Sequence, residues 1–220
     1  MSGPDLRVPA IAGFYEEYLD HQDSAGFLRK VAKLYSAGTL ERLASHGHRQ
    51  VRRAAVLALG LLGDYEANAT LGRALTDDDR TVRILAENAI RSVWNRAGND
   101  SHRQQLAMIL RMNASRHYAE AIRRATLLIE QAPWLAEPWN QRATARLHRS
   151  EFSEAIRDAH QALEINPYHF VAAATMGQAY LELGNRVSAL EAFRRALRLN
   201  PNLDGIRAQV VRLARMVEGK

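Results

Sequence analysis

Three segments in the second half of the chain repeat one another at a fixed interval, and this periodicity constrains the fold more than any other feature. Each copy ends in proline, and successive prolines lie 34 residues apart. The copies are AEAIRRATLLIEQAP at 119–133, SEAIRDAHQALEINP at 153–167 and VSALEAFRRALRLNP at 187–201. A period of about 20–50 residues is typical of solenoids, in which each unit buries its apolar face only by stacking on the next unit.

Most of the chain has a helical pattern. Apolar positions recur three and four residues apart. One such stripe consists of Val51, Ala55, Ala58, Leu59 and Leu62. Asparagine before proline is pushed out of the helical region, so Asn166 and Asn200 each mark a helix end, and Ser101 with Gln104 predicts a capping box at a helix start. We expect an all-α protein, an α-solenoid of stacked antiparallel helical hairpins with about thirteen helices.

The 34-residue unit resembles the tetratricopeptide repeat (TPR), which consists of two antiparallel helices. The last unit matches the motif best, through Ala173, Met176, Gly177, Tyr180, Ala189, Phe193, Ala196 and Pro201. Gly177 and Ala189 are expected to be small because the two helices approach closely there. The middle unit has Arg142 and Arg146 where the motif has Leu and Tyr, and we expect their stems to pack on apolar surface with the charged heads in water.

The flanks of this array follow from the same register. The first unit departs from the motif at Gln105, Ile109 and Met112, and it is assigned from its 34-residue register. Residues 203–217 are expected to form a final helix with a buried stripe of Ile206, Val210, Leu213 and Val217. Arg207, Arg212 and Arg215 lie off that stripe, as expected of a polar cap at a solenoid end.

The first half of the chain repeats with a shorter period. A segment starting at Thr39 returns 31 residues later at Thr70. This part resembles HEAT-like repeats of the phycobilin-lyase type. The resemblance implies that Arg83 pairs with an acid of the preceding turn, Asp77-Asp78-Asp79, whereas Arg52 has no acid in its own turn and needs a partner elsewhere. We expect residues 1–98 to form a HEAT-like region, with a capping hairpin at 10–36, and residues 99–220 to form three TPR units and a capping helix.

Composition narrows the class of protein. The chain of 220 residues has no cysteine, which excludes disulfides, thiolate metal sites and cysteine nucleophiles. It shows neither a signal-peptide pattern nor an apolar run long enough to span a membrane, so we expect a cytoplasmic protein. The resemblance to HEAT-like repeats of a bacterial type implies a bacterial one. The net charge is +6, with 17 Lys+Arg against 12 Asp+Glu in residues 99–220. Such a balance is compatible with an acidic partner.

No catalytic or metal-binding constellation is evident. The chain lacks a phosphate-binding glycine loop and the common hydrolase and zinc motifs, so we expect no enzyme, no cofactor and no metal. Three consecutive acids before a helix are better explained as N-caps than as metal ligands, and His46 and His48 lack a third ligand. Trp134, Trp139, Tyr180 and Phe193 have core spacing, and Trp94 is expected to pack between the two repeat types.

The candidate site comes from the TPR resemblance. In such arrays the first helices of successive hairpins line a concave surface that holds an extended peptide or a partner helix. The corresponding residues here are Leu106, Leu110, Asn140, Gln141, Thr144, His148, Thr175, Gln178 and Glu182. We call them the polar strip; its amides suit a peptide backbone because they donate and accept hydrogen bonds. The charged clamp for chaperone tails is absent, since Leu106, Leu110, Val171 and Thr175 occupy its positions.

Two functions are compatible with these sequence features. The first is a non-catalytic scaffold or adaptor that binds a peptide or partner protein on its concave surface. The alternative is a nucleic-acid (RNA) binder that uses the arginine-rich surface. Many arginines have an acid three or four residues away, such as Glu120 before Arg123 and Glu191 before Arg195, which favours ordinary surface pairs. The partner, the pathway, the oligomeric state and the half that carries the main binding surface stay open.

Overall fold

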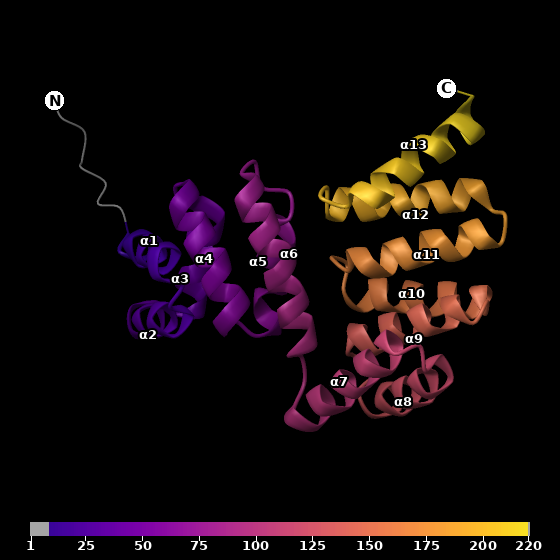
Figure 1. The fold of residues 1–220 in the computed structure, drawn as a ribbon, viewed down its shortest axis with the longest axis horizontal. Helices are drawn as coiled ribbons and strands as arrows, with labels where there is room; N and C mark the ends of the chain where they lie inside the picture. The colour runs from indigo at the N-terminus through magenta and orange to yellow at the C-terminus, as the bar shows by residue number, and fades with distance from the viewer. Residues whose placement is uncertain (1–8, 220) are drawn as a thin grey trace. The chain divides into compact units, whose positions relative to one another are not determined.

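The structure is a computed structural model that describes residues 9–219 (Figure 1). Over those residues the chain forms thirteen α-helices and one short 3₁₀ helix, so the prediction of an all-α fold with about thirteen helices is confirmed. The chain divides into two compact units, Met1–Val93 and Trp94–Lys220, and each is described by itself below. The first eight residues, which bear on the expected lack of a signal peptide, lie outside the described range.

The first unit consists of short helical hairpins. Its helices are α1 (Ile11–His21), α2 (Ser24–Leu34), α3 (Ala37–His46), α4 (Arg49–Leu62), α5 (Asn68–Ala74) and α6 (Arg80–Asn95), of which α6 continues two residues past the unit. The hairpin expected at residues 10–36 is present as α1 and α2, which pack against each other and against α4. The α4 stripe is buried as expected, except that Leu62 at its end is exposed.

The turn before α6 joins two repeats through ion pairs. Arg52 on α4 donates to both carboxylate oxygens of Asp77 at 2.8 Å, which supplies the distant partner that its own turn lacks. Asp79 accepts from the main-chain N–H of Val82 at 3.0 Å, so it caps α6 as expected, and it also pairs with Arg53. Arg83 donates to the main-chain oxygen of Asp77 at 2.8 Å.

The second unit is a stack of hairpins in chain order. Each helix packs on the next, and α9 also contacts both α7 and α11. The helices are α7 (Asp100–Ala114), α8 (Tyr118–Gln131), α9 (Ala136–His148), α10 (Phe152–Ile165), α11 (Phe170–Glu182), α12 (Arg186–Leu199) and α13 (Asp204–Glu218). Helices α10 and α12 stop immediately before Asn166 and Asn200, which have extended backbone, as the Asn-Pro pairs predict.

Two local expectations have a more precise outcome. A Cβ atom on Gly177 would lie 2.6 Å from the ring of Phe193, so the close approach is real and its neighbour is that ring. The capping box lies two residues earlier than expected. Because α7 begins at Asp100, Asn99 is its N-cap and accepts from His102 N–H at 2.9 Å, while the His102 ring accepts from Asn99 N–H.

The arginine heads of the middle unit are not in water. Arg142 is 9% exposed, and its guanidinium donates two hydrogen bonds of 2.8 Å to Asp158, which is 2% exposed. It also donates to Thr126 on α8 at 2.9 Å and lies over the ring of Trp139. Arg146 reaches the same carboxylate at 2.6 Å. The expectation of solvated heads was wrong because Asp158 on α10 offers a carboxylate inside the hairpin.

Two surface expectations also need correction. Trp134, which has core spacing, is 62% exposed, because it lies in the turn between α8 and α9. Phe193 is fully buried, as expected. On α13 the predicted stripe centres on the buried Leu213, but the outer face is not only polar, since Val211 and Met216 are about half exposed.

Candidate functional site

The polar strip lies on α7, α9 and α11, three first helices that follow one another in the second unit. Leu110, Gln141, Thr144 and Gln178 are half-buried, and His148 and Glu182 are exposed. Leu106, Asn140 and Thr175 are buried. Leu106 packs with Ile109 and Ala125 in the core of the first hairpin. Six of the nine side chains are therefore at least partly exposed.

The base of the strip holds a carboxylate that the sequence analysis missed. Glu137 is 8% exposed and accepts from His169 Nε2 at 2.9 Å, Gln141 Nε2 at 2.6 Å and Asn140 Nδ2 at 3.2 Å. Burial raises the pKa of Glu137, but these hydrogen bonds outweigh it and hold the pKa below its ordinary value. The strip is thus built on an ionised, buried carboxylate.

His169 has a defined tautomer in this network. It is the N-cap of α11, and its Nδ1 accepts from the main-chain N–H of Ala172 at 3.2 Å. A nitrogen that accepts carries no proton, so the proton of the neutral ring is on Nε2 and points to Glu137. Glu137 precedes Asn140 by three residues on one helix face, which the sequence could have indicated. His169 lies before a helix and belongs to no periodic pattern.

Amide groups connect α7 to α9. Asn113 Nδ2 donates to the main-chain oxygen and to Oε1 of Gln141, at 3.0 and 2.8 Å. The amide of Gln141 is therefore engaged on both sides, by Asn113 and by Glu137. The Oδ1 atoms of Asn113 and Asn140 are buried without a hydrogen-bond partner. The chain itself does not satisfy these two acceptors, and leaving a buried acceptor without a hydrogen bond costs free energy.

Aromatic rings close two edges of the strip. Trp94, the first residue of the second unit, is 3% exposed and stacks on His169 with ring centroids 4.2 Å apart. Its ring also contacts Phe170. At the other end, His148 stacks on Tyr118 at 4.8 Å. These contacts restrict His169 and His148, so the strip is a largely preformed surface.

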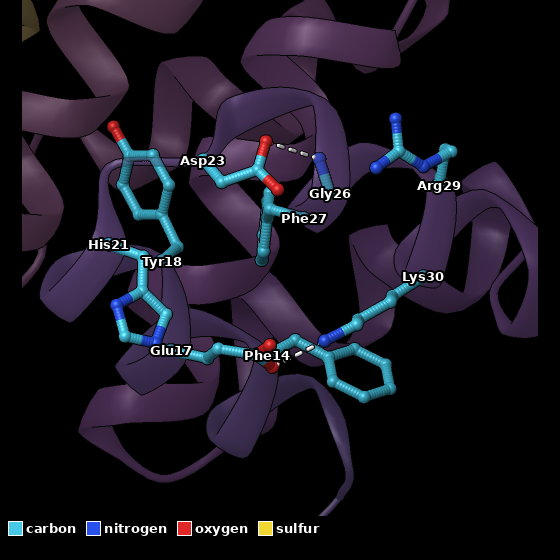
Figure 2. Close-up of a pocket in the computed structure, with 9 residues that line it drawn as sticks. All are labelled: Phe14, Glu17, Tyr18, His21, Asp23, Gly26, Phe27, Arg29 and Lys30. Carbon is cyan, nitrogen blue, oxygen red and sulfur yellow. Dashed lines mark hydrogen bonds and ion pairs between the residues drawn. The ribbon is translucent and has the colours of Figure 1, made fainter.

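The first unit has a smaller hollow, of about 190 Å³, between α1 and α2 (Figure 2). Three of its charged side chains are engaged by neighbouring groups of the same hairpin. Lys30 pairs with Glu17 and lies near the ring of Phe14, and Asp23 caps α2 by accepting from Gly26 N–H at 2.8 Å. These interactions stabilise the hairpin, and Arg29 also lines the hollow.

Residues 9–219 contain neither a cluster of potential metal ligands nor a helix suited to cross a membrane. Within them, no three His, Asp or Glu side chains converge in a way that could hold a metal ion. Within the same range, no helix has both the length and the apolar character needed to cross a membrane.

Family comparisons agree with the repeat architecture. Residues 36–126 match the family model for HEAT repeats, and residues 171–203 match the model for the tetratricopeptide repeat. The protein is therefore a helical repeat protein. It carries HEAT repeats followed by a tetratricopeptide repeat, as the sequence resemblance implied. The HEAT match continues past residue 98 through α7 and into α8.

Similar proteins include two that are named for tetratricopeptide repeats. A TPR repeat-containing protein of Rhizobium etli is 27% identical over 143 residues, which are 65% of this chain and 69% of that protein. Small glutamine-rich tetratricopeptide repeat-containing protein 2 of Saccharomyces cerevisiae is 32% identical over 84 residues, 38% of this chain but only 24% of that protein. The match thus spans about a quarter of the yeast relative.

Two solved structures that align with most of this chain are described as TPR structures. The TPR2AB domain of yeast Sti1, in its pHSP90 complex, aligns with 93% of this chain and 97% of its own, with a TM-score of 0.48 and 16% identity. YrrB, described as a TPR protein with an unusual peptide-binding site, aligns with 90% of this chain and 98% of its own, with a TM-score of 0.46 and 16% identity.

Proposed function

We propose that the protein is a non-catalytic interaction scaffold that binds a peptide or a segment of a partner protein on the polar strip. The observation that carries the proposal is the continuity of the strip: α9 contacts both α7 and α11, and all three helices contribute half-buried or exposed strip residues. HEAT and TPR repeats are typical of non-catalytic scaffolds. The proposed setting is the cytoplasm of a bacterium; the Rhizobium relative supports a bacterial origin.

The chemistry of the strip favours a ligand that offers backbone donors and a small apolar side chain. Gln178 donates to Glu182 at 2.6 Å and keeps its amide oxygen available as an acceptor. Leu110 supplies apolar surface at the α7 end. The positions of the charged chaperone-tail clamp hold Leu106, Leu110, Val171 and Thr175. The proposed ligand is therefore an internal, largely uncharged peptide segment rather than a free carboxyl terminus.

The test is photo-crosslinking from the strip in bacterial lysate. A photoreactive amino acid replaces Gln178, and in a control protein it replaces Gln161, which is exposed on α10. Half of each sample is treated with nuclease, and crosslinked material is identified. A discrete protein crosslinked from position 178, absent at position 161 and insensitive to nuclease, supports the proposal. Crosslinks that are lost with nuclease favour the RNA-binding alternative.

A further inference from the structure

The second unit has a hollow on the side of α11 that faces away from the polar strip. It has a volume of about 560 Å³ and is lined by side chains of α10, α11 and α12. Met176 and Tyr180 of α11 line it. At 100° per residue these two positions lie roughly 150° around the helix from Thr175, Gln178 and Glu182. A ligand in this hollow therefore does not compete for the residues of the polar strip.

The hollow is basic on one wall and apolar on its floor. Arg194, Arg195 and Arg198 of α12 line it, with Glu191 as its carboxylate. The expected pair between Glu191 and Arg195 is not formed: in the described range no carboxylate lies within ion-pair distance of Arg195 or of Arg198. Two guanidinium groups thus face this hollow without an ionic partner. Because Arg195 and Arg198 are three residues apart, they are neighbours on the helix surface.

The neighbouring second helices do not continue this charge. On α8, Arg123 and Arg124 both pair with Glu120. On α10, Arg157 pairs with Glu154 at 3.0 Å. Among the second helices α8, α10 and α12, it is therefore α12 that presents arginines without an ionic partner to a hollow. The arginines of α13 line a different hollow.

We propose that this hollow, which we call the arginine groove, binds an acidic segment of a partner protein. It is defined by Met176, Tyr180, Ala192, Arg194, Arg195 and Arg198. Carboxylates of the segment accept charge-assisted hydrogen bonds from Arg195 and Arg198, and an apolar side chain packs on Met176 and Ala192. This goes beyond the proposed function because both the surface and the chemistry of the ligand differ from those of the polar strip.

Charge distribution favours a short acidic peptide over a nucleic acid. Binding to a nucleic acid gains most of its affinity from many phosphate contacts along a continuous basic surface. The arginine groove offers the arginines of one helix, and the arginines named above on the second helices α8 and α10 are paired with acids. Glu191 also lines the groove and repels a phosphate backbone, whereas a peptide can place a hydrogen-bond donor beside it.

The test is selection of random twelve-residue peptides displayed on phage against the intact protein at low salt. Three variants are compared with the wild type. The double variant Arg195→Glu, Arg198→Glu reverses the charge of the arginine groove at these two positions. Arg186→Glu is the matched control, because Arg186 is exposed on the same helix and does not line the groove. Gln178→Arg alters only the polar strip. Circular dichroism checks that each variant is folded.

The expected result is a selected pool enriched in Asp and Glu. Synthetic peptides from that pool should bind the double variant about tenfold or more weakly than the wild type, and bind the other two variants unchanged. Three results would overturn the proposal: a pool without acidic enrichment, acidic peptides that bind the double variant as well as the wild type, or a twenty-nucleotide oligouridylate that displaces those peptides at equal concentration. If the polar strip binds no peptide, the result expected for the arginine groove is unchanged, because Gln178 does not line that groove.

Discussion

At the scale of single residues, the buried pair of Arg142 and Asp158 is the least TPR-like feature of the second unit. A guanidinium replaces the leucine of the motif, and it is stable there because one carboxylate, one hydroxyl and one aromatic ring surround it. Removing water from two charges is expensive, and it is offset only while the pair is intact. The stability of the hairpin therefore depends on both partners being present.

Asp158→Ala should lower the free energy of unfolding by about 3–5 kcal/mol, because it leaves the Arg142 guanidinium buried without its carboxylate. Urea denaturation measures the change. The control is Glu154→Ala on the same helix, whose exposed pair with Arg157 should contribute far less to stability than the buried pair does. Adding Arg142→Leu to Asp158→Ala should recover most of the loss. A double variant as unstable as the single one would contradict the explanation.

Gly177 is required by its neighbour rather than by its backbone conformation. Gly177→Ala should destabilise the protein by about 1–3 kcal/mol, because the new Cβ would lie 2.6 Å from the Phe193 ring. Gly205→Ala in α13 is the matched control, since no atom lies within 4 Å of its Cβ position. It should be neutral or slightly stabilising. Thermal unfolding of both variants checks the prediction, and equal effects would show that crowding is not the cause.

At the scale of elements, the turn before α6 links two repeats through ion pairs with α4. Asp77 accepts hydrogen bonds from Arg52 of α4, and Asp79 accepts them from Arg53 of the same helix. Asp79 also caps α6. Helix capping and repeat stacking therefore rely on the same carboxylate. Hydrogen bonds from Arg53 are the main reason that the pKa of Asp79 falls from 3.8 to about 2.

This depressed pKa has a consequence for acid stability. A carboxyl group with a lower pKa in the folded protein stabilises the fold above its unfolded pKa, and that contribution is lost as pH falls through the folded pKa. The wild type should therefore lose stability between about pH 4 and pH 2, and Asp79→Asn should reduce that slope. Asp78→Asn is the control, since Asp78 is 88% exposed. Urea titrations at several pH values measure the slope, and identical slopes for the wild type and Asp79→Asn would refute this role of Asp79.

At the scale of the whole molecule, the chain is two compact units, each held by contacts between neighbouring hairpins. In such arrays each repeat contacts only its neighbours, so stability is close to a sum of local terms. A destabilising change should then act mostly within its own unit.

Hydrogen exchange tests that expectation. Asp158→Ala should increase amide exchange in α8 to α11 more than in α1 to α4, and Asp79→Asn should have the opposite bias. Mass spectrometry of peptic fragments gives the exchange of each helix. Uniform acceleration over the whole chain in both variants would mean that the units unfold as one, against the prediction.

The candidate site was only partly predictable from the sequence. Aligning the chain with the TPR repeat correctly predicted five residues of consecutive first helices whose side chains are at least partly exposed: Gln141, Thr144, His148, Gln178 and Glu182. It could not anticipate that Asn140 and Thr175 are buried, or that Gln141 is already engaged by Asn113 and Glu137. Helix periodicity gives the direction of a side chain, whereas its burial depends on what packs against that helix from elsewhere in the chain.

The sequence by itself determined the features that follow from local chemistry and period: about thirteen helices, the ends of two of them at Asn-Pro, the stacked hairpins and the small residue at Gly177. Each of these depends on neighbours along the chain or on a repeat of fixed length. Only the tertiary structure decided which carboxylate meets Arg52 or Arg142, where His169 lies, and which arginines of α12 stay unpaired. Those outcomes depend on distances between residues many positions apart, which are set by how the hairpins stack.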